Sequence, residues 1–202
     1  GLDFDGMLPD GSRFHITRPP LSPAGSTLTI RKFAAAHRGL DNLVSRRFLT
    51  AKVARFLEAC TLARLNIMIS GATGAGKTTL LNALASRIPL NERVISVEDI
   101  PEIKLSHSNW VRLLAVREGK GITTRDCLIG CLRMRPDRII VGECRSSEAL
   151  DMLQAMNTGH DGGLTTIHAN STGDAISRLE SLVLFHAGAD IPLRALRRQI
   201  VD

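Results

Sequence analysis

A glycine-rich run that ends in lysine and threonine, GATGAGKT at residues 71–78, is the segment whose residue types best suit chemistry. It matches the pattern G-x-x-x-x-G-K-[ST], in which backbone N–H groups of small residues wrap a phosphate without obstruction by side chains. In that pattern Lys77 reaches the β- and γ-phosphates of a nucleotide, and the Thr78 hydroxyl binds Mg²⁺. The predicted nucleotide-binding residues are Gly71, Ala72, Thr73, Gly74, Ala75, Gly76, Lys77, Thr78 and Thr79.

The elements expected on either side of this run support the same interpretation. An apolar strand is predicted at residues 66–70 and a helix at residues 78–87. A helix that starts behind the loop directs the positive end of its dipole at a bound anion. The alternative is a chance glycine-rich turn, which average composition produces in roughly one chain in a hundred of this length. Because the strand and the helix are required as well, the sequence favours a nucleotide-binding loop.

Acidic residues follow two of the predicted strands. Glu143 comes directly after residues 138–142, and Glu98 and Asp99 follow residues 94–97. Ligands of such sheets bind beyond the carboxyl ends of the strands, where hydrolysis needs groups that hold a metal and orient the attacking water. Each acid alone could equally be a solvated charge or a helix-cap partner. Beside one phosphate loop, Glu98 and Glu143 are predicted to be catalytic.

A histidine, His168, ends a further predicted strand at residues 164–168. A lone histidine at a strand end is more often structural, and this alternative stays open. The glycines that precede the strand, at positions 159, 162 and 163, permit local movement. At the sheet edge where a γ-phosphate would lie, a histidine can donate a hydrogen bond to the phosphate and report its presence.

Short apolar strands alternate with helical patterns along most of the chain. The predicted strands are residues 66–70, 94–97, 111–115, 138–142 and 164–168, and the predicted helices are residues 78–87, 124–134, 147–157 and 172–185. Before them, a helical pattern with Asp41 as its N-cap is predicted from the spacing of Leu43, Val44, Phe48, Val53, Phe56, Leu57 and Cys60. The alternation predicts an α/β fold with a mostly parallel sheet and helices on both faces.

The first part of the chain has a different pattern. Residues 8–11, Leu-Pro-Asp-Gly, predict a turn, and residues 13–16 and 27–31 alternate as strands do. We expect three parts: the C-terminal part of a smaller α+β N-terminal domain at residues 1–31, a linker at 32–40, and a nucleotide-binding domain, truncated at its C-terminal end, at 41–202.

The amino-acid composition excludes some classes of protein but does not identify a function. Hydrophobic residues make up 44% and charged residues 23% of the chain, which excludes disorder and fibrous repeats. No apolar run approaches the roughly 20 residues that a membrane-spanning helix needs, and residues 1–10 carry no secretory signal. The net charge of +6 is compatible with nucleic acid, an anionic membrane or nucleotide phosphates. The cysteines are predicted to be small buried hydrophobes: Cys60, Cys127, Cys131 and Cys144.

Four segments, in this order, resemble the Walker A, Asp, Walker B and His boxes of the secretion ATPase superfamily, the motors of type II and type IV secretion and of type IV pili. They are GATGAGKTT, VISVEDIPEI, MRPDRIIVGECR and TGHDGGLTTIHAN. Together with LPDGSRFHITRPPLS and TLTIRKF, they are most similar to the CpaF type, which powers assembly of Tad/Flp pili. The resemblance spans nearly the whole chain. It departs at Ala72 and Ala75, and in the Cys-Arg-Ser-Ser that follows Glu143.

The resemblance implies a RecA-like P-loop core at residues 41–202 and a mechanochemical ATPase that uses ATP and Mg²⁺. Glu98 and Glu143 would divide the work of polarising water and holding the Mg²⁺ shell, and which does which stays open. Thr78 and Glu143, the latter through water, are the predicted metal-site residues, and His168 would sense the γ-phosphate. The candidates for clamping the phosphates are Arg31, Arg112 and Arg117.

Relatives of this kind act as homohexamers, cytoplasmic and peripheral at the inner membrane, and pass motion to membrane platform proteins. The same is therefore expected of the full-length protein. The alternatives are a type IV secretion ATPase that moves protein or DNA, and a nucleic-acid-binding RecA-like module. Aromatic residues are 3% of the chain, with one Trp and no Tyr, so platforms for base stacking are scarce. Direct binding to nucleic acid is not expected.

Overall fold

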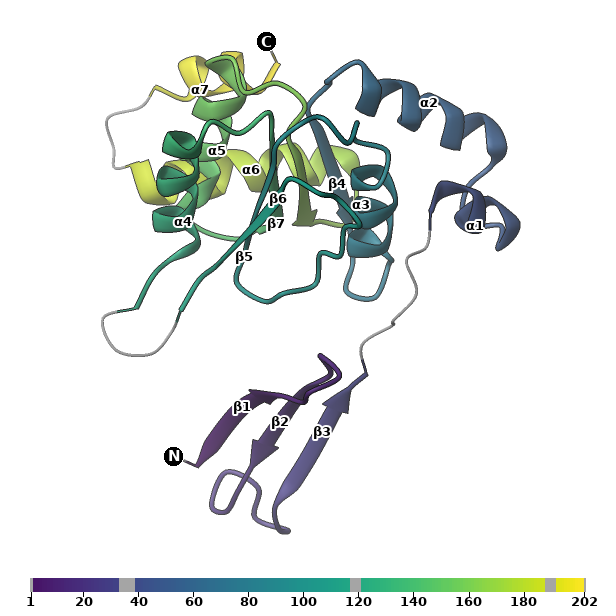
Figure 1. The fold of residues 1–202 in the computed structure, drawn as a ribbon. Coiled ribbons are helices and arrows are strands. Elements are labelled where there is room, and N and C mark those ends of the chain that lie inside the picture. Colours follow the sequence, from purple (N-terminus) through teal and green to yellow (C-terminus); the bar gives the residue numbers. More distant parts are fainter. Residues whose placement is uncertain (1, 33–38, 117–120, 188–191, 202) are drawn as a thin grey trace. The chain divides into compact units, whose positions relative to one another are not determined.

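The computed structural model describes residues 2–32, 39–116, 121–187 and 192–201 (Figure 1). The chain divides into two compact units, Gly1–Ala36 and His37–Asp202. The predicted linker, residues 32–40, lies mostly outside the described residues. The assignment of residues 1–31 to a separate N-terminal domain stays a prediction.

The first unit contains an antiparallel sheet with the strand order β1-β2-β3. Its strands are β1 (Asp3–Met7), β2 (Arg13–Thr17) and β3 (Thr27–Arg31). The turn predicted at residues 8–11 is present, and Gly11 adopts a φ of +83° there. The strands predicted at residues 13–16 and 27–31 are confirmed as β2 and β3. No separate strand was predicted at β1.

The second unit is built around a five-stranded sheet, in which every neighbouring pair of strands is parallel. Its strands are β4 (Ile67–Gly71), β5 (Val94–Glu98), β6 (Trp110–Leu114), β7 (Arg138–Cys144) and β8 (Leu164–His168), in the order β4-β8-β7-β5-β6. Each predicted strand is confirmed: residues 164–168 match without change, and the ends of the other four differ by one or two residues. Because all strands run the same way, their carboxyl ends meet at one edge of the sheet.

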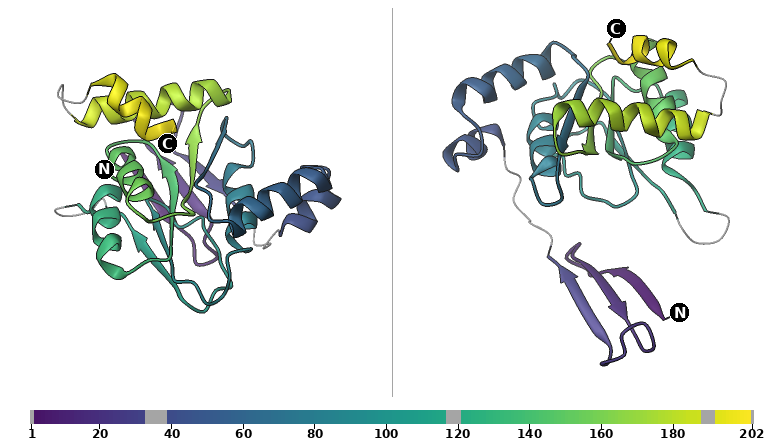
Figure 2. Two further views of the ribbon diagram at one scale, coloured as in Figure 1. Left: turned by 90° about the horizontal axis from the view of Figure 1, so that it is seen from above. Right: turned by 180° about the vertical axis from the view of Figure 1, so that it is seen from behind.

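Helices cover both faces of this sheet, as predicted (Figure 2). They are α1 (Leu40–Ser45), α2 (Ala51–Leu62), α3 (Lys77–Ala85), α4 (Thr124–Cys131), α5 (Glu148–Asn157), α6 (Thr172–Ala187) and α7 (Leu193–Val201), with a 3-10 turn at Leu132–Met134. The strand residues alternate between two cores. In β7, Ile140 packs with residues of α1 and α3, whereas Ile139 and Val141 pack with residues of α4 to α7. The α/β fold class is therefore confirmed.

The helical pattern that begins near Asp41 differs from the prediction. The N-cap of α1 is Gly39, so Asp41 lies in the first turn and is not the cap. The pattern is split into two helices, because Arg47 adopts a left-handed φ of +58° between them. Thr50 then caps α2 by accepting a hydrogen bond from the amide of Val53 over 3.2 Å. Several apolar side chains of the pattern are exposed rather than buried: Phe48, Val53 and Phe56.

The cysteines are buried, as predicted, and none forms a disulfide. Burial raises the pKa of the Cys131 and Cys144 thiols to about 12, which keeps them neutral. Within the described ranges, none of the helices is both long and apolar enough to span a bilayer.

Candidate active site

The glycine-rich run connects the end of β4 to the start of α3. Gly74 and Gly76 adopt left-handed φ values of +77° and +91°, which side chains disfavour. A Cβ on Gly76 would also lie 2.9 Å from the ring of Phe48. Small residues are therefore needed both for the backbone conformation and for the space around the loop.

The loop has the features of an anion cradle. The N-terminus of α3 has no side-chain cap, because its N-cap residue is Gly76. Lys77 folds back over the loop, where Nζ donates to the carbonyl oxygens of Gly71 over 2.9 Å and Ala72 over 3.0 Å. A bound phosphate offers this ammonium group a charged acceptor in place of neutral carbonyls. The geometry fits the predicted phosphate loop.

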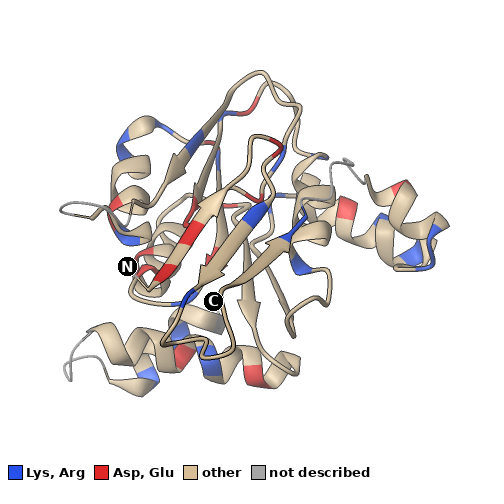
Figure 3. Cartoon of the chain, turned by 90° about the horizontal axis from the view of Figure 1, so that it is seen from below, with Lys and Arg blue, Asp and Glu red and all other residues tan. Residues whose placement is uncertain are grey.

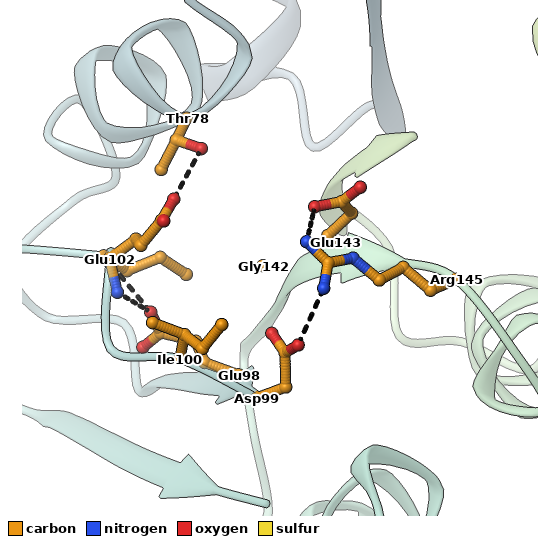
Figure 4. Close-up of a pocket in the computed structure, with 9 residues that line it drawn as sticks. Thr78, Glu98, Asp99, Ile100, Glu102, Gly142, Glu143 and Arg145 are labelled. Atoms are coloured by element: carbon orange, nitrogen blue, oxygen red, sulfur yellow. Dashed lines mark hydrogen bonds and ion pairs between the residues drawn. The ribbon is translucent and has the colours of Figure 1, made fainter. Parts of the chain in front are cut away.

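Thr78 has a carboxylate partner that sequence reasoning missed. Its Oγ1 donates a hydrogen bond to Oε2 of Glu102 over 3.1 Å (Figure 4). Only acids directly at strand ends were considered catalytic candidates, whereas Glu102 comes four residues after the end of β5. The signal was present in the sequence, because Pro101 in the segment DIPE favours a turn that can bring a third acid back to the site.

Glu98, a predicted catalytic residue, is almost fully buried with 2% of its surface exposed. Its Oε2 accepts hydrogen bonds from the amides of Glu102 and Ile103, each over 2.7 Å. Its Oε1 accepts from Nε of Arg112 over 3.1 Å and from Oγ of Ser96 over 3.3 Å. Burial raises the pKa of Glu98, although these hydrogen bonds and the Arg112 charge oppose the rise.

The candidate clamping arginines have different surroundings. Arg112 lies in β6, where its guanidinium binds Glu98 and the carbonyl of Ile103 and stacks over the ring of Trp110, 4.6 Å from its centroid. Arg31 lies in β3 of the first unit, with an exposed side chain. Arg117 lies outside the described residues. The phosphate-clamping role of all three stays a prediction.

Glu143 lies inside β7, which runs two residues further than predicted. Its Oε2 accepts from Nη2 of Arg145 over 2.6 Å, and Nη1 of the same arginine donates to Oδ2 of Asp99 over 3.0 Å (Figure 4). The segment that carries Arg145 is held by the buried carboxylate of Glu148, which accepts from the amides of Arg145 and Ser146. Arg145 thus bridges Asp99, which follows β5, and Glu143, which lies near the end of β7.

One pocket brings most of these groups together. It is lined by Thr78, Glu98, Asp99, Ile100, Glu102, Ile103, Gly142, Glu143 and Arg145 (Figure 4). His168 does not line this pocket, but it pairs in register with Gly71, and its side chain is exposed. Among the described residues, no cluster of three or more His, Cys, Asp or Glu side chains could hold a metal ion.

Charged residues are spread over many elements rather than collected on one. Lysine and arginine positions, and aspartate and glutamate positions, both occur on several helices and strands of the cartoon (Figure 3).

A parallel sheet with helices on both faces, and a glycine-rich loop between β4 and α3, define the P-loop nucleotide-binding class of α/β proteins. Residues 5–199 match the family described as type II/IV secretion system protein, and the chain belongs to that family.

Named relatives agree with this family. The chain is 41% identical over 174 residues to a Mycobacterium tuberculosis protein named "Putative conjugal transfer protein", with 84% of this chain and 49% of the relative covered. The conjugal transfer protein TrbB of Rhizobium radiobacter is 41% identical over 181 residues, with 88% of this chain and 55% of the relative covered. The chain spans about half the length of these curated relatives.

A solved structure gives the same result for the fold. The VirB11 ATPase of the Brucella suis type IV secretion system, in complex with sulphate, superposes with a TM-score of 0.69 and 31% identity. The match covers 98% of this chain and 65% of that one. The expected membership of the secretion ATPase superfamily is therefore confirmed.

Proposed function

We propose that the chain is the catalytic part of an ATPase that converts ATP and water to ADP and phosphate and thereby drives a type IV secretion machine. The observation that carries the proposal is the Thr78–Glu102 hydrogen bond directly behind the phosphate loop, with Glu143 lining the same pocket. This arrangement combines a phosphate cradle with the carboxylates that hydrolysis requires.

Phosphate binding is assigned to the loop and to Lys77. The uncapped start of α3 offers N–H groups and a positive dipole end to an anion. Lys77 exchanges the carbonyl oxygens of Gly71 and Ala72 for phosphate oxygens. Thr79, the third residue of α3, is proposed to contribute its amide and hydroxyl on the same side.

Mg²⁺, when bound, would neutralise negative charge on the phosphates. Thr78 is proposed to supply a hydroxyl ligand, and its hydrogen bond to Glu102 fixes the direction of that hydroxyl. Glu102 and Glu143 are proposed to hold the water shell of the cation and to accept a proton from the attacking water. Arg145 has to leave Glu143 for that carboxylate to act as a base, since it now forms a 2.6 Å hydrogen bond with it.

His168 is proposed to sense the γ-phosphate. Its register with Gly71 puts it beside the first residue of the loop. A hydrogen bond from its imidazole to a γ-phosphate would distinguish ATP from ADP, because ADP has no such group.

The choice of machine rests on the relatives. The names reported above are VirB11 and conjugal transfer proteins, so they favour the type IV secretion alternative over the Tad/Flp pilus interpretation. A homohexamer that acts at the periphery of the inner membrane with platform proteins stays our proposal for the full-length protein.

The machine is tested in a strain that lacks the gene and carries plasmid copies of the full-length protein. The wild-type copy should restore transfer of DNA or protein between cells, and a Lys77→Ala copy should not. A matched Lys52→Ala copy, which changes an exposed lysine of α2, should restore transfer as well as wild type does. If the wild-type copy restores pilus assembly but has no effect on transfer, the protein would instead be assigned to the Tad/Flp type.

A further inference from the structure

The hydrogen bonds of Glu98 leave little of its carboxylate available to a substrate. A carboxylate has about four lone-pair sites for hydrogen bonds. The amides of Glu102 and Ile103, Nε of Arg112 and Oγ of Ser96 all donate to this carboxylate. The side chain is only 1% exposed. A water molecule or a metal shell would have to displace one of these donors before it could bind Glu98.

The same hydrogen bonds fix the segment that carries Glu102. Oε2 of Glu98 holds two successive amides, so the backbone turns sharply around this one oxygen atom. From the other side, Asn82 of α3 donates to the carbonyl of Glu102 over 3.1 Å and accepts from the amide of Lys104 over 2.7 Å. The segment is therefore clamped between β5 and α3, and the Glu102 carboxylate faces Thr78.

The contacts of Arg112 fit a counter-ion of Glu98. Its side chain is 31% exposed, and its guanidinium lies between Glu98, the carbonyl of Ile103 and the ring of Trp110. Trp110 in turn donates from Nε1 to Oγ of Ser96 over 2.9 Å. An arginine in this position offsets the cost of burying the charge of Glu98.

We propose that Glu98, with Arg112 as its counter-ion, is a positioning residue that holds the backbone at Glu102 so that the Glu102 carboxylate meets Thr78. Glu98 then acts on hydrolysis only through Glu102. The inference rests on the proposed function for the catalytic role of Glu102, but the restraint of the backbone at Glu102 can be measured without ATP hydrolysis.

The first test measures the restraint of the backbone at Glu102 and Ile103 by hydrogen–deuterium exchange of the full-length protein. In Glu98→Gln, a side-chain NH₂ group would face the N–H groups that now donate to the carboxylate, and it cannot accept their hydrogen bonds. The amide protons of Glu102 and Ile103 should therefore exchange about ten- to a hundredfold faster. Arg112→Met should act in the same direction and serves as the second variant if Glu98→Gln does not fold. Glu180→Gln, which alters a carboxylate–arginine pair outside the pocket, should leave these amides unchanged.

The second readout is Mn²⁺ affinity in the presence of ADP, which needs no hydrolysis. Glu98→Gln and Glu102→Gln should both weaken Mn²⁺ binding, by about tenfold or more, while affinity for metal-free ADP stays unchanged. Unchanged exchange at Glu102 and Ile103, together with unchanged Mn²⁺ affinity, would overturn the positioning role.

The third readout is a double-mutant cycle in ATP hydrolysis. Glu98→Gln should lower kcat by about 10²-fold, and it should add less than about twofold in a Glu102→Gln background. If the losses of kcat from Glu98→Gln and Glu102→Gln multiply in the double variant, Glu98 acts in catalysis independently of Glu102. If Arg112→Met weakens ADP binding, Arg112 is a phosphate clamp instead. A wild-type protein without ATPase activity would refute the proposed function, while exchange and Mn²⁺ binding would still decide the positioning role.

Discussion

His168 lies directly beside Gly71, because β8 pairs with β4 in a parallel register that aligns the last residue of each strand. Gly71 is also the first residue of the phosphate loop. The pairing therefore brings together two motifs that are far apart in the sequence, and the side chain of the histidine is exposed there.

His168→Ala in the full-length protein should remove discrimination between ATP and ADP while ADP affinity is retained. A hydrogen bond to a charged group contributes about 1.5–3 kcal/mol, so the ratio of affinities for a non-hydrolysable ATP analogue and ADP should fall roughly ten- to a hundredfold. His107→Ala, outside the pocket, is the control. If the ratio of the two affinities is unchanged, His168 has a structural role and does not sense the γ-phosphate.

Thr78→Val and Glu102→Gln should separate metal binding from proton transfer. Valine has the shape of threonine without the hydroxyl, so we expect a rise of about tenfold or more in the Mg²⁺ concentration needed for half-maximal activity. Glu102→Gln should keep ATP bound and lower kcat by about 10²–10⁴-fold. Steady-state rates across a Mg²⁺ titration provide both values. A Glu102→Gln enzyme with the wild-type kcat would exclude Glu102 from the chemistry.

The buried ion pair of Arg138 and Glu92 should be the most sensitive point for stability. Arg138 is 1% exposed and also donates to the carbonyl of Thr61 over 2.9 Å. Glu92→Gln removes the negative charge and leaves a buried cation, which typically costs about 3–5 kcal/mol. Urea unfolding followed by circular dichroism measures the loss. Glu180→Gln, whose partner Arg197 is exposed, should cost less than about 1 kcal/mol. Equal losses would contradict this difference.

The capping box of α4 should give stability a measurable pH dependence. Hydrogen bonds from the hydroxyl and amide of Thr123 lower the pKa of Asp126 from its ordinary value of 3.8. The folded state therefore prefers the ionised acid, so its contribution is present above pH 3.8 and is lost as pH falls through the lowered value. Asp126→Ala should be less stable than wild type near pH 6, with a difference that shrinks toward pH 3. A constant difference would show that charge is not involved.

Much of the fold could be predicted, because apolar strands and helical spacing reflect local sequence. Residues 164–168 were predicted without error, and the other sheet strands shifted only at their ends. The helical pattern after Asp41 was less informative, because apolar spacing does not reveal that Arg47 breaks it with a positive φ. Nor does apolar character ensure burial, as the 66% exposed Phe56 shows.

The site was predicted only in part, because the sequence gives residue types but not the hydrogen bonds that decide their roles. Glu98 ends β5 and Glu102 lies four residues further on, and position alone favoured Glu98. The structure buries Glu98 among protein donors and directs Glu102 to Thr78. That distinction depends on the turn at Pro101 and on Arg112 from the next strand, which are tertiary relationships.

We propose that this phosphate loop binds ATP for hydrolysis, and Lys77→Ala in the full-length protein tests that role most directly. Phosphate release from ATP should be measured for wild type, Lys77→Ala and Lys52→Ala, with circular dichroism to verify folding. We expect wild type and Lys52→Ala to hydrolyse ATP, and our prediction for Lys77→Ala is a folded protein without measurable turnover. A folded Lys77→Ala protein that hydrolyses ATP at the wild-type rate would contradict it.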